Sequence, residues 1–312
     1  DAGANLRWWF WAGALSMFKE NFIAGVDIGH FALESPRYLG DVLWSSDGQS
    51  FMHNTLLTEH PHNDFLLVAS ETGVIGVLFC VSLLFIAVKG RGPEWAAFCA
   101  WLVFALFNSP LHSPPHALAG FMLAACLVQR SSGPLPEEFS AAMWGRRLVG
   151  ALSVAMLPAI AVFVLLPSYR LQRAQQAHIA GQPALQLYAA AESVNGALHA
   201  EIDEKYGVAL LDAKDYESAR KHFKEALKGS DSGSVYLGIG TAQYQLGNKA
   251  EAYVALEKAV YRWPSHLNAW RLLVRVCPDS ERDAWLGKAA RFLRSSEIKI
   301  LEGEADKDTS QR

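Results

Sequence analysis

The stretch that decides the fold is FLLVASETGVIGVLFCVSLLFIAV, residues 65–88. A helix needs about 20 predominantly apolar residues to cross a bilayer, and this stretch is interrupted only by Glu71 near its start. We therefore predict a transmembrane helix here. The whole chain agrees with this prediction, because 51% of its 312 residues are hydrophobic and only 19% are charged, a balance that is typical of a partly membrane-embedded protein.

Three further apolar stretches follow, at residues 95–109, 115–129 and 148–167. The first two are short for independent spans and are joined by the Pro- and His-bearing link 108–115, so we expect a helical hairpin. The third is long enough to cross a bilayer, with Pro158 inside it. The predicted fold is therefore all-α, with polytopic transmembrane helices over residues 65–167.

Basic residues set the expected orientation, since Lys and Arg in short loops are retained on the cytoplasmic side. The link around His112 has neither Lys nor Arg. The basic residues that we expect in the cytoplasm are Lys89, Arg91, Arg130, Arg146 and Arg147. It follows that residues 1–64, the His112 link and everything after the fourth span face the extracytoplasmic side, which in a bacterium is the periplasm.

Charge divides the chain near residue 168. Residues 1–167 hold 8 of the 28 Lys and Arg and 12 of the 31 Asp and Glu, and the remaining residues hold all the others. The second part is thus expected to be a soluble domain, residues 168–301. A net charge of −3 without any Lys/Arg-rich run gives no reason to expect a nucleic-acid partner.

The soluble part contains a repeat. At a constant offset of 33 residues, Gly240, Ala252, Leu256 and Ala259 repeat Gly207, Ala219, Phe223 and Ala226. Small residues at such places let paired helices approach closely, as in tetratricopeptide repeats. Degenerate copies are expected at 170–196 and 267–295, and the polar tail 302–312 is expected to be disordered. Such arrays are binding surfaces, so we expect a protein partner.

The aromatic run Trp8-Trp9-Phe10-Trp11 lies close to the start of the sequence. Trp favours the boundary between water and lipid, so residues 5–20 are expected to form an interfacial helix, although a plain buried helix fits equally well. The chain does not begin with Met, and we expect that an N-terminal membrane region precedes it.

The segment TEHPHNDFLLVASETGVIG, residues 58–76, carries a motif. It resembles the hallmark of the O-antigen ligase family, in which His is followed by Asn, Ser or Gln, nine residues, Gly, two residues, and then Gly or a similar residue. His62, Asn63, Gly73 and Gly76 fill these places. Residues 17–31 resemble the family's stretch before its large periplasmic loop, and tetratricopeptide tails occur in the family.

The resemblance implies a multi-pass glycosyltransferase of the bacterial inner membrane, with its tetratricopeptide domain in the periplasm. It would move a glycan from an undecaprenyl-diphosphate carrier to an acceptor hydroxyl, in contact with membrane lipids. That acceptor is lipid A core for ligases, a growing glycan for polymerases and protein Ser for protein O-oligosaccharyltransferases. No metal or other cofactor is implied.

We assign roles to six residues on this basis. His62 is the candidate general base, and Arg37 is the candidate contact for the diphosphate, because imidazole can accept the proton of the attacking hydroxyl and guanidinium can bind phosphate oxygens. Candidate substrate-binding residues are Asn63, Asp64, His112 and His116.

Structural interpretations of these residues stay open. Asn63 or Asp64 could only cap the following helix, Arg37 could be a solvated loop residue, His112 and His116 could be interface histidines, and Gly73 and Gly76 could only permit close helix contact. His53, Glu59, His60, His62 and Asp64 could together suggest a metal site, but Pro61 between the two central His residues argues against it. The alternative function is a non-enzymatic, membrane-anchored tetratricopeptide scaffold.

Overall fold

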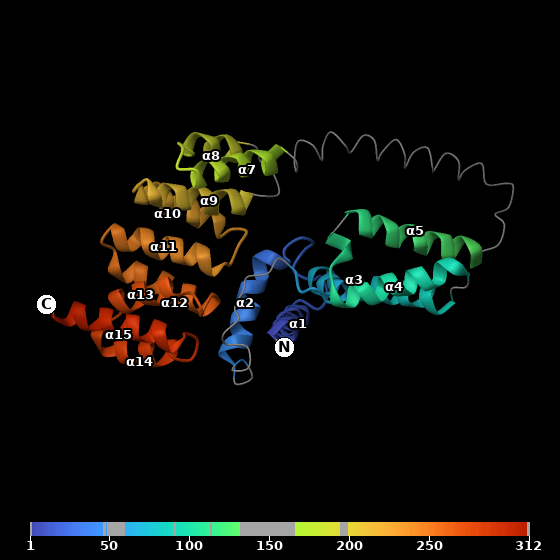
Figure 1. The fold of residues 1–312 in the computed structure, drawn as a ribbon, viewed down its shortest axis with the longest axis horizontal. Helices are drawn as coiled ribbons and strands as arrows, with labels where there is room; N and C mark the ends of the chain where they lie inside the picture. Colours follow the sequence, from blue (N-terminus) through green and yellow to red (C-terminus); the bar gives the residue numbers. More distant parts are fainter. Residues whose placement is uncertain are drawn as a thin grey trace. The chain divides into compact units, whose positions relative to one another are not determined.

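The structure is a computed structural model, and it describes residues 2–45, 48, 60–89, 92–112, 114–131, 166–193 and 199–310. These residues form helices and turns without any strand, so the all-α prediction is confirmed for them (Figure 1). The chain divides into two compact units, Asp1–Met143 and Trp144–Arg312. The boundary predicted near residue 168 differs from this division, because residue 168 lies inside helix α7, Leu166–Ile179.

The first unit contains five α-helices and one short 3-10 helix in its described residues. They are α1 (Ala2–Glu20), α2 (Phe31–Trp44), α3 (Asp64–Lys89), α4 (Pro93–Phe107), η2 (Pro110–His112) and α5 (Pro114–Ser131). Helices α1, α2 and the start of α3 share one buried cluster made of Ala14, Met17, Phe31, Tyr38 and Leu67. A second cluster joins α3, α4 and α5 and contains Leu83, Phe98, Leu102, Ala124 and Leu127.

Helix α3 is the predicted first span. Among the described residues it is the one helix that is long and apolar enough to cross a membrane, with 26 residues and an 18-residue stretch of mean hydropathy 2.3. The predicted hairpin is α4 and α5 joined by η2, but its apolar helices, Pro93–Phe107 and Pro115–Leu127, are shorter than a full span. The predicted fourth span at 148–167 lies outside the described residues, except that its last two residues begin α7.

Helix α3 is broken at Gly73, whose backbone has φ 63° and ψ −145°. In a regular helix the Val74 nitrogen would bond the Ser70 oxygen. Instead, Val74 N donates to Phe22 O at 2.8 Å, and Ser70 O accepts from Val26 N at 3.0 Å. The connection between α1 and α2 thus inserts its own backbone into the helix ladder of α3.

Helix α2 was not expected from the sequence. Its buried residues include Phe31, Ser35, Tyr38, Leu39 and Leu43, a spacing that repeats with the 3.6-residue period of a helix. The glycines around it and Pro36 within it obscure this pattern.

The second unit is a succession of helices that stack as neighbouring pairs (Figure 1). After α7 they are α8 (Leu185–Glu192), α9 (His199–Asp212), α10 (Tyr216–Ala226), α11 (Gly233–Gln245), α12 (Lys249–Arg262), α13 (Leu267–Val276), α14 (Asp279–Ala289) and α15 (Ser295–Ser310). Regions 170–196 and 267–295, where degenerate copies were expected, contain the pairs α7/α8 and α13/α14.

The residues that repeat at an offset of 33 occupy equivalent positions. Phe223 and Leu256 are both fully buried, and each faces a glycine of the preceding helix. A Cβ atom on Gly207 would lie 3.0 Å from the Phe223 ring, and one on Gly240 would lie 2.5 Å from Leu256 Cγ. Glycine at these positions therefore allows the large side chain of the partner helix to reach the backbone.

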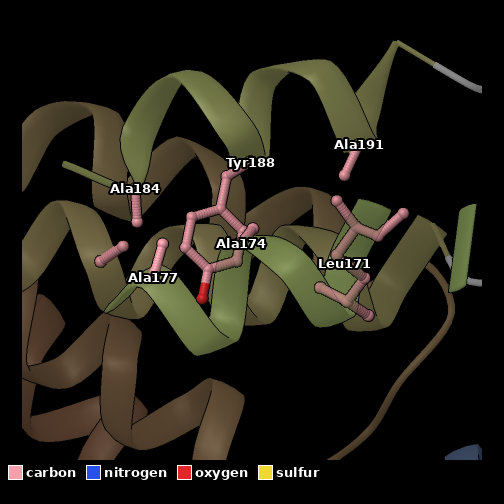
Figure 2. Close-up of a cluster of buried hydrophobic side chains, with 8 residues drawn as sticks. Leu171, Ala174, Ala177, Ala184, Tyr188 and Ala191 are labelled. Carbon is pink, nitrogen blue, oxygen red and sulfur yellow. The ribbon is translucent and has the colours of Figure 1, made fainter. Parts of the chain in front are cut away.

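Both ends of the array have their own buried residues. At the first end, Tyr188 of α8 packs among small side chains of α7 and α8, including Ala174, Ala177 and Ala184 (Figure 2). At the other end, Leu301 is fully buried and lies within α15, which continues to Ser310. The expectation of a disordered tail from residue 302 is corrected accordingly, because the buried Leu301 anchors the helix that contains it.

Candidate functional site

His62 lies immediately before α3 with a left-handed backbone, φ 54°. Few residues other than glycine adopt this conformation, and it costs free energy where it is held. The imidazole is half-buried; its ring centroid lies 6.1 Å from that of Phe10 and 4.6 Å from that of His60. Trp11 Nε1 donates to Pro61 O at 3.1 Å, so helix α1 holds the loop that presents His62.

The environment of His62 favours the neutral imidazole. Burial lowers its pKa from the ordinary value of 6.5, and the positive charge of Arg7 lowers it further. Both effects disfavour the protonated ring. A neutral imidazole at pH 7 can accept a proton, which is what a general base requires.

Asn63 and Asp64 fix the start of α3. The Asn63 Oδ1 accepts from Leu66 N at 3.0 Å, so Asn63 is a helix cap, as the structural interpretation of this residue had it. Asp64 is buried, and its Oδ2 accepts from Leu111 N at 2.8 Å. The carboxylate therefore ties the beginning of α3 to the link between α4 and α5.

The structure does not bring Arg37 to His62. The Arg37 guanidinium lies 2.9 Å from the carboxylate of Glu20, the last residue of α1. Phe10, which faces His62, precedes Glu20 by ten residues on α1. A helix rises 1.5 Å per residue, so Phe10 and Glu20 are roughly 15 Å apart along the helix. Arg37 is thus half-exposed in an ion pair at the other end of α1.

Arg7 is the cation whose charge reaches His62, and it was not predicted from the sequence. It lies on α1 three and four residues before Phe10 and Trp11, the two aromatic residues that face the His62 loop. Residues at this spacing share one face of a helix. The sequence signal that could have identified Arg7 is therefore its position directly before the aromatic run.

The two remaining predicted substrate-binding residues lie at the hairpin link. His116 is exposed; its carbonyl oxygen accepts from Trp101 Nε1 at 2.9 Å, and its ring centroid lies 6.1 Å from that of Phe104. His112 ends η2, and its side chain lies outside the described part. Leu111 beside it is bonded to Asp64, so the link and the His62 loop meet at one end of α3.

Of the residues weighed as a metal set, His60, His62 and Asp64 are described, whereas His53 and Glu59 lie outside the described residues. The His60 and His62 rings are in edge-to-face contact. The Asp64 Oδ2 accepts a hydrogen bond from the Leu111 backbone nitrogen.

A separate groove lies in the second unit, among α10, α11 and α12. It has a volume of about 430 Å³ and is lined mainly by apolar atoms. Lys258 lies over the Tyr236 ring at 5.3 Å, and the Tyr236 hydroxyl donates to Asp231 at 2.8 Å. The residues that line the groove include Lys224, Leu227, Tyr236, Ile239, Val254 and Lys258.

Comparison with known proteins adds little about chemistry. No family model matches the chain. Over 95 residues, or 30% of its length, the chain is 30% identical to cilia- and flagella-associated protein 70 of Macaca fascicularis and of Homo sapiens. The match spans 9% and 8% of these two proteins, so it is a local similarity.

Proposed function

We propose that this chain acts as a polytopic membrane glycosyltransferase that resembles O-antigen ligases. It moves a glycan from an undecaprenyl-diphosphate carrier to an acceptor hydroxyl at the periplasmic face of the bacterial inner membrane. The observation that carries the proposal is His62, a half-buried imidazole with a lowered pKa, held in a left-handed turn where α3 begins.

The surface of α3 supports membrane insertion. Large apolar side chains on it are mostly uncovered by the protein: Ile75 is 69% exposed, Leu78 63% and Val88 77%. In water such a surface would cost free energy, about 25 cal/mol per Å² of apolar area, whereas lipid covers it at no such cost. Similar exposure on α4 and α5 suits a hairpin that packs on α3 within the bilayer.

The bond between Asp64 and Leu111 supports the assigned orientation. The link between α4 and α5 is free of Lys and Arg and was assigned to the periplasmic side by this composition. The link contacts the first residue of α3, which is expected if the link and the His62 loop lie on the same side of the membrane.

In the proposed reaction, the acceptor hydroxyl attacks the anomeric carbon of the glycan. His62 takes the hydroxyl proton as the new C–O bond forms, and the bond from the anomeric carbon to the diphosphate oxygen breaks. The undecaprenyl diphosphate leaves with the bonding electrons. We assign to Arg7, whose positive charge lowers the pKa of His62, the role of offsetting the negative charge of this leaving group. We prefer it to Arg37, which is paired with Glu20.

The second unit fits a tetratricopeptide-like array that recruits a partner on the same side of the membrane. The 33-residue repetition of buried positions and the apolar groove among α10, α11 and α12 support this role. The same groove favours the second candidate function, in which the membrane part only anchors a binding scaffold.

The proposal is tested by replacing His62 with Ala in the full-length protein in its host cell. We expect surface-glycan attachment to be lost, with the glycan-carrying bands missing from a gel while the protein stays in the membrane fraction. A normal glycan profile from a correctly inserted variant would reject the enzyme and favour the scaffold.

A further inference from the structure

Four ionisable side chains lie close together in the second unit, far in sequence from the His62 motif. We name Glu192, His199, Asp203 and His222 the histidine–carboxylate cluster. Glu192 ends α8, His199 and Asp203 lie one turn apart at the start of α9, and His222 comes from α10. The cluster thus connects three helices of the array.

Asp203 is the centre of the cluster and is fully buried. Its Oδ1 lies 2.7 Å from His222 Nδ1, and its Oδ2 lies 2.6 Å from His199 Nδ1. The second contact is close, yet Oδ2 accepts no hydrogen bond of acceptable geometry. A buried carboxylate oxygen that lacks a hydrogen bond costs free energy, so this atom is available to another partner.

Glu192 completes the convergence. Its Oε1 lies 3.9 Å from His222 Nδ1, and the ligand atoms of Glu192, Asp203 and His222 all lie within 4.8 Å of one another. The His222 ring also packs against Tyr206, with 4.3 Å between ring centroids. This contact limits the orientations of the imidazole and keeps Nδ1 directed at the two carboxylates.

We propose that the histidine–carboxylate cluster is a divalent metal site that takes Zn²⁺, with Glu192, Asp203 and His222, whose ligand atoms already lie close together, as ligands. His199, whose Nδ1 contacts Asp203, becomes the fourth ligand after its half-exposed side chain rotates. Imidazole nitrogen and carboxylate oxygen are common zinc ligands, usually four in number in structural sites. Two carboxylates and two neutral imidazoles carry a charge of −2 together, so Zn²⁺ makes the partly buried group neutral.

The required adjustment is small for Glu192, Asp203 and His222, whose ligand atoms already lie within 4.8 Å of one another, and His199 must rotate toward them. With zinc bonds of about 2.0–2.2 Å, tetrahedral ligand atoms lie roughly 3.4 Å apart. Asp203 and His222 must therefore separate slightly from 2.7 Å, and Glu192 must approach from 3.9 Å. Side-chain rotation suffices for Glu192, because it is 38% exposed. The metal would fasten α8 to α9 and α10, which stabilises the array at that junction.

The test uses the full chain in detergent, freed of metal by a chelator and then titrated with ZnCl₂ alone. We expect one ion per chain by equilibrium dialysis, a higher unfolding temperature with zinc, and release of protons, since zinc ligands must be deprotonated. CoCl₂ in place of zinc should give the strong visible absorption of tetrahedral Co²⁺.

Glu192→Gln and His222→Gln are each expected to weaken zinc binding at least tenfold, because even residues that only orient metal ligands change affinity about 10–100-fold. His178→Gln is the matched control. It removes a histidine that also contacts a carboxylate, Asp212 at 2.9 Å, outside the cluster, and should bind zinc like the unaltered chain.

Circular dichroism of each metal-free variant checks that it is folded. Glu192→Gln decides the result if His222→Gln does not fold, because Glu192 is partly exposed at a helix end. Absence of saturable zinc binding by the unaltered chain would overturn the proposal. Unchanged affinity in the folded variants would overturn it equally.

Discussion

The backbone nitrogen of Val74 donates a 2.8 Å hydrogen bond to the carbonyl oxygen of Phe22, across more than fifty residues of sequence. This bond replaces the one that Val74 would make within its own helix. It is possible because Gly73 adopts φ 63° and ψ −145°, and it joins α3 to the connection between α1 and α2. The first motif glycine that follows His62 is thus explained by backbone geometry.

Gly73→Ala is predicted to destabilise the first unit by about 1–3 kcal/mol, the usual cost of such a backbone conformation in a residue with a side chain. The added Cβ would also lie 2.5 Å from Ile23 O and 2.7 Å from Phe22 O. Unfolding of the purified chain in mixed detergent micelles measures the change.

Gly29→Ala is the matched control for this prediction. Gly29 has a similar positive φ of 82°, but nothing lies within 4 Å of its added Cβ. It should lose only the backbone contribution and therefore less stability than Gly73→Ala. Equal losses of stability in the two variants would show that the backbone contact between Phe22 and Val74 does not contribute to the stability of the first unit.

Arg7→Gln is predicted to raise the pKa of His62. The sign follows from the charge, because removing a positive neighbour makes the protonated imidazole easier to form. Burial, the larger cause, remains in the variant, so the pKa should stay below the ordinary value of 6.5. Histidine NMR in micelles measures the shift, and Arg7→Lys should keep the original value. If the pKa of His62 were unchanged in Arg7→Gln, Arg7 would have no electrostatic effect on His62.

Gly240→Ala is predicted to destabilise the second unit by about 1–3 kcal/mol, the usual cost of overpacking. The new Cβ would lie 2.5 Å from Cγ of the fully buried Leu256. Chemical denaturation monitored by circular dichroism gives the comparison with Gly287→Ala on α14. Gly287 has open space around it, and alanine there should stabilise the helix by about 0.5–1 kcal/mol. A Gly240→Ala variant as stable as Gly287→Ala would contradict the close packing.

Cysteine labelling tests the proposed orientation. The native Cys80, Cys99, Cys126 and Cys277 are free thiols and are first replaced by Ser or Ala. A single cysteine at residue 112 should react with a membrane-impermeant maleimide added to the periplasmic side, and one at residue 91 should not. Equal reaction at both positions would refute the topology.

The sequence predicted most of the helices because their apolar patterns are strong. The stretch 65–88 reads as one apolar run, and the 33-residue repetition by itself predicts that α9 to α12 pack as two equivalent pairs. Helix α2 was missed because Pro36 and flanking glycines hide a regular set of buried residues. The extent of α15 was missed because polar composition does not reveal that Leu301 is buried.

The site was predicted less completely. Asn63 and Asp64 were singled out as candidate substrate-binding residues or helix caps, but their partners, Leu66 and Leu111, depend on how the chain folds back. Arg37 was chosen for its isolation in the sequence, and only the structure pairs it with Glu20. Pairings between distant segments leave no trace in the residue pattern, which is why neither Arg7 nor the histidine–carboxylate cluster was predicted.

The central claim is that His62 acts as the base in glycan transfer. It is tested most directly by the rate of transfer from a labelled undecaprenyl-diphosphate glycan to acceptor by the purified full-length protein, for the unaltered chain and for His62→Gln. His30→Gln is the control, because His30 precedes α2 without a side-chain capping bond. The account predicts a loss of roughly 10²–10⁴-fold in the His62 variant, with donor binding retained and the control active. Transfer by His62→Gln at the rate of the unaltered chain would contradict it.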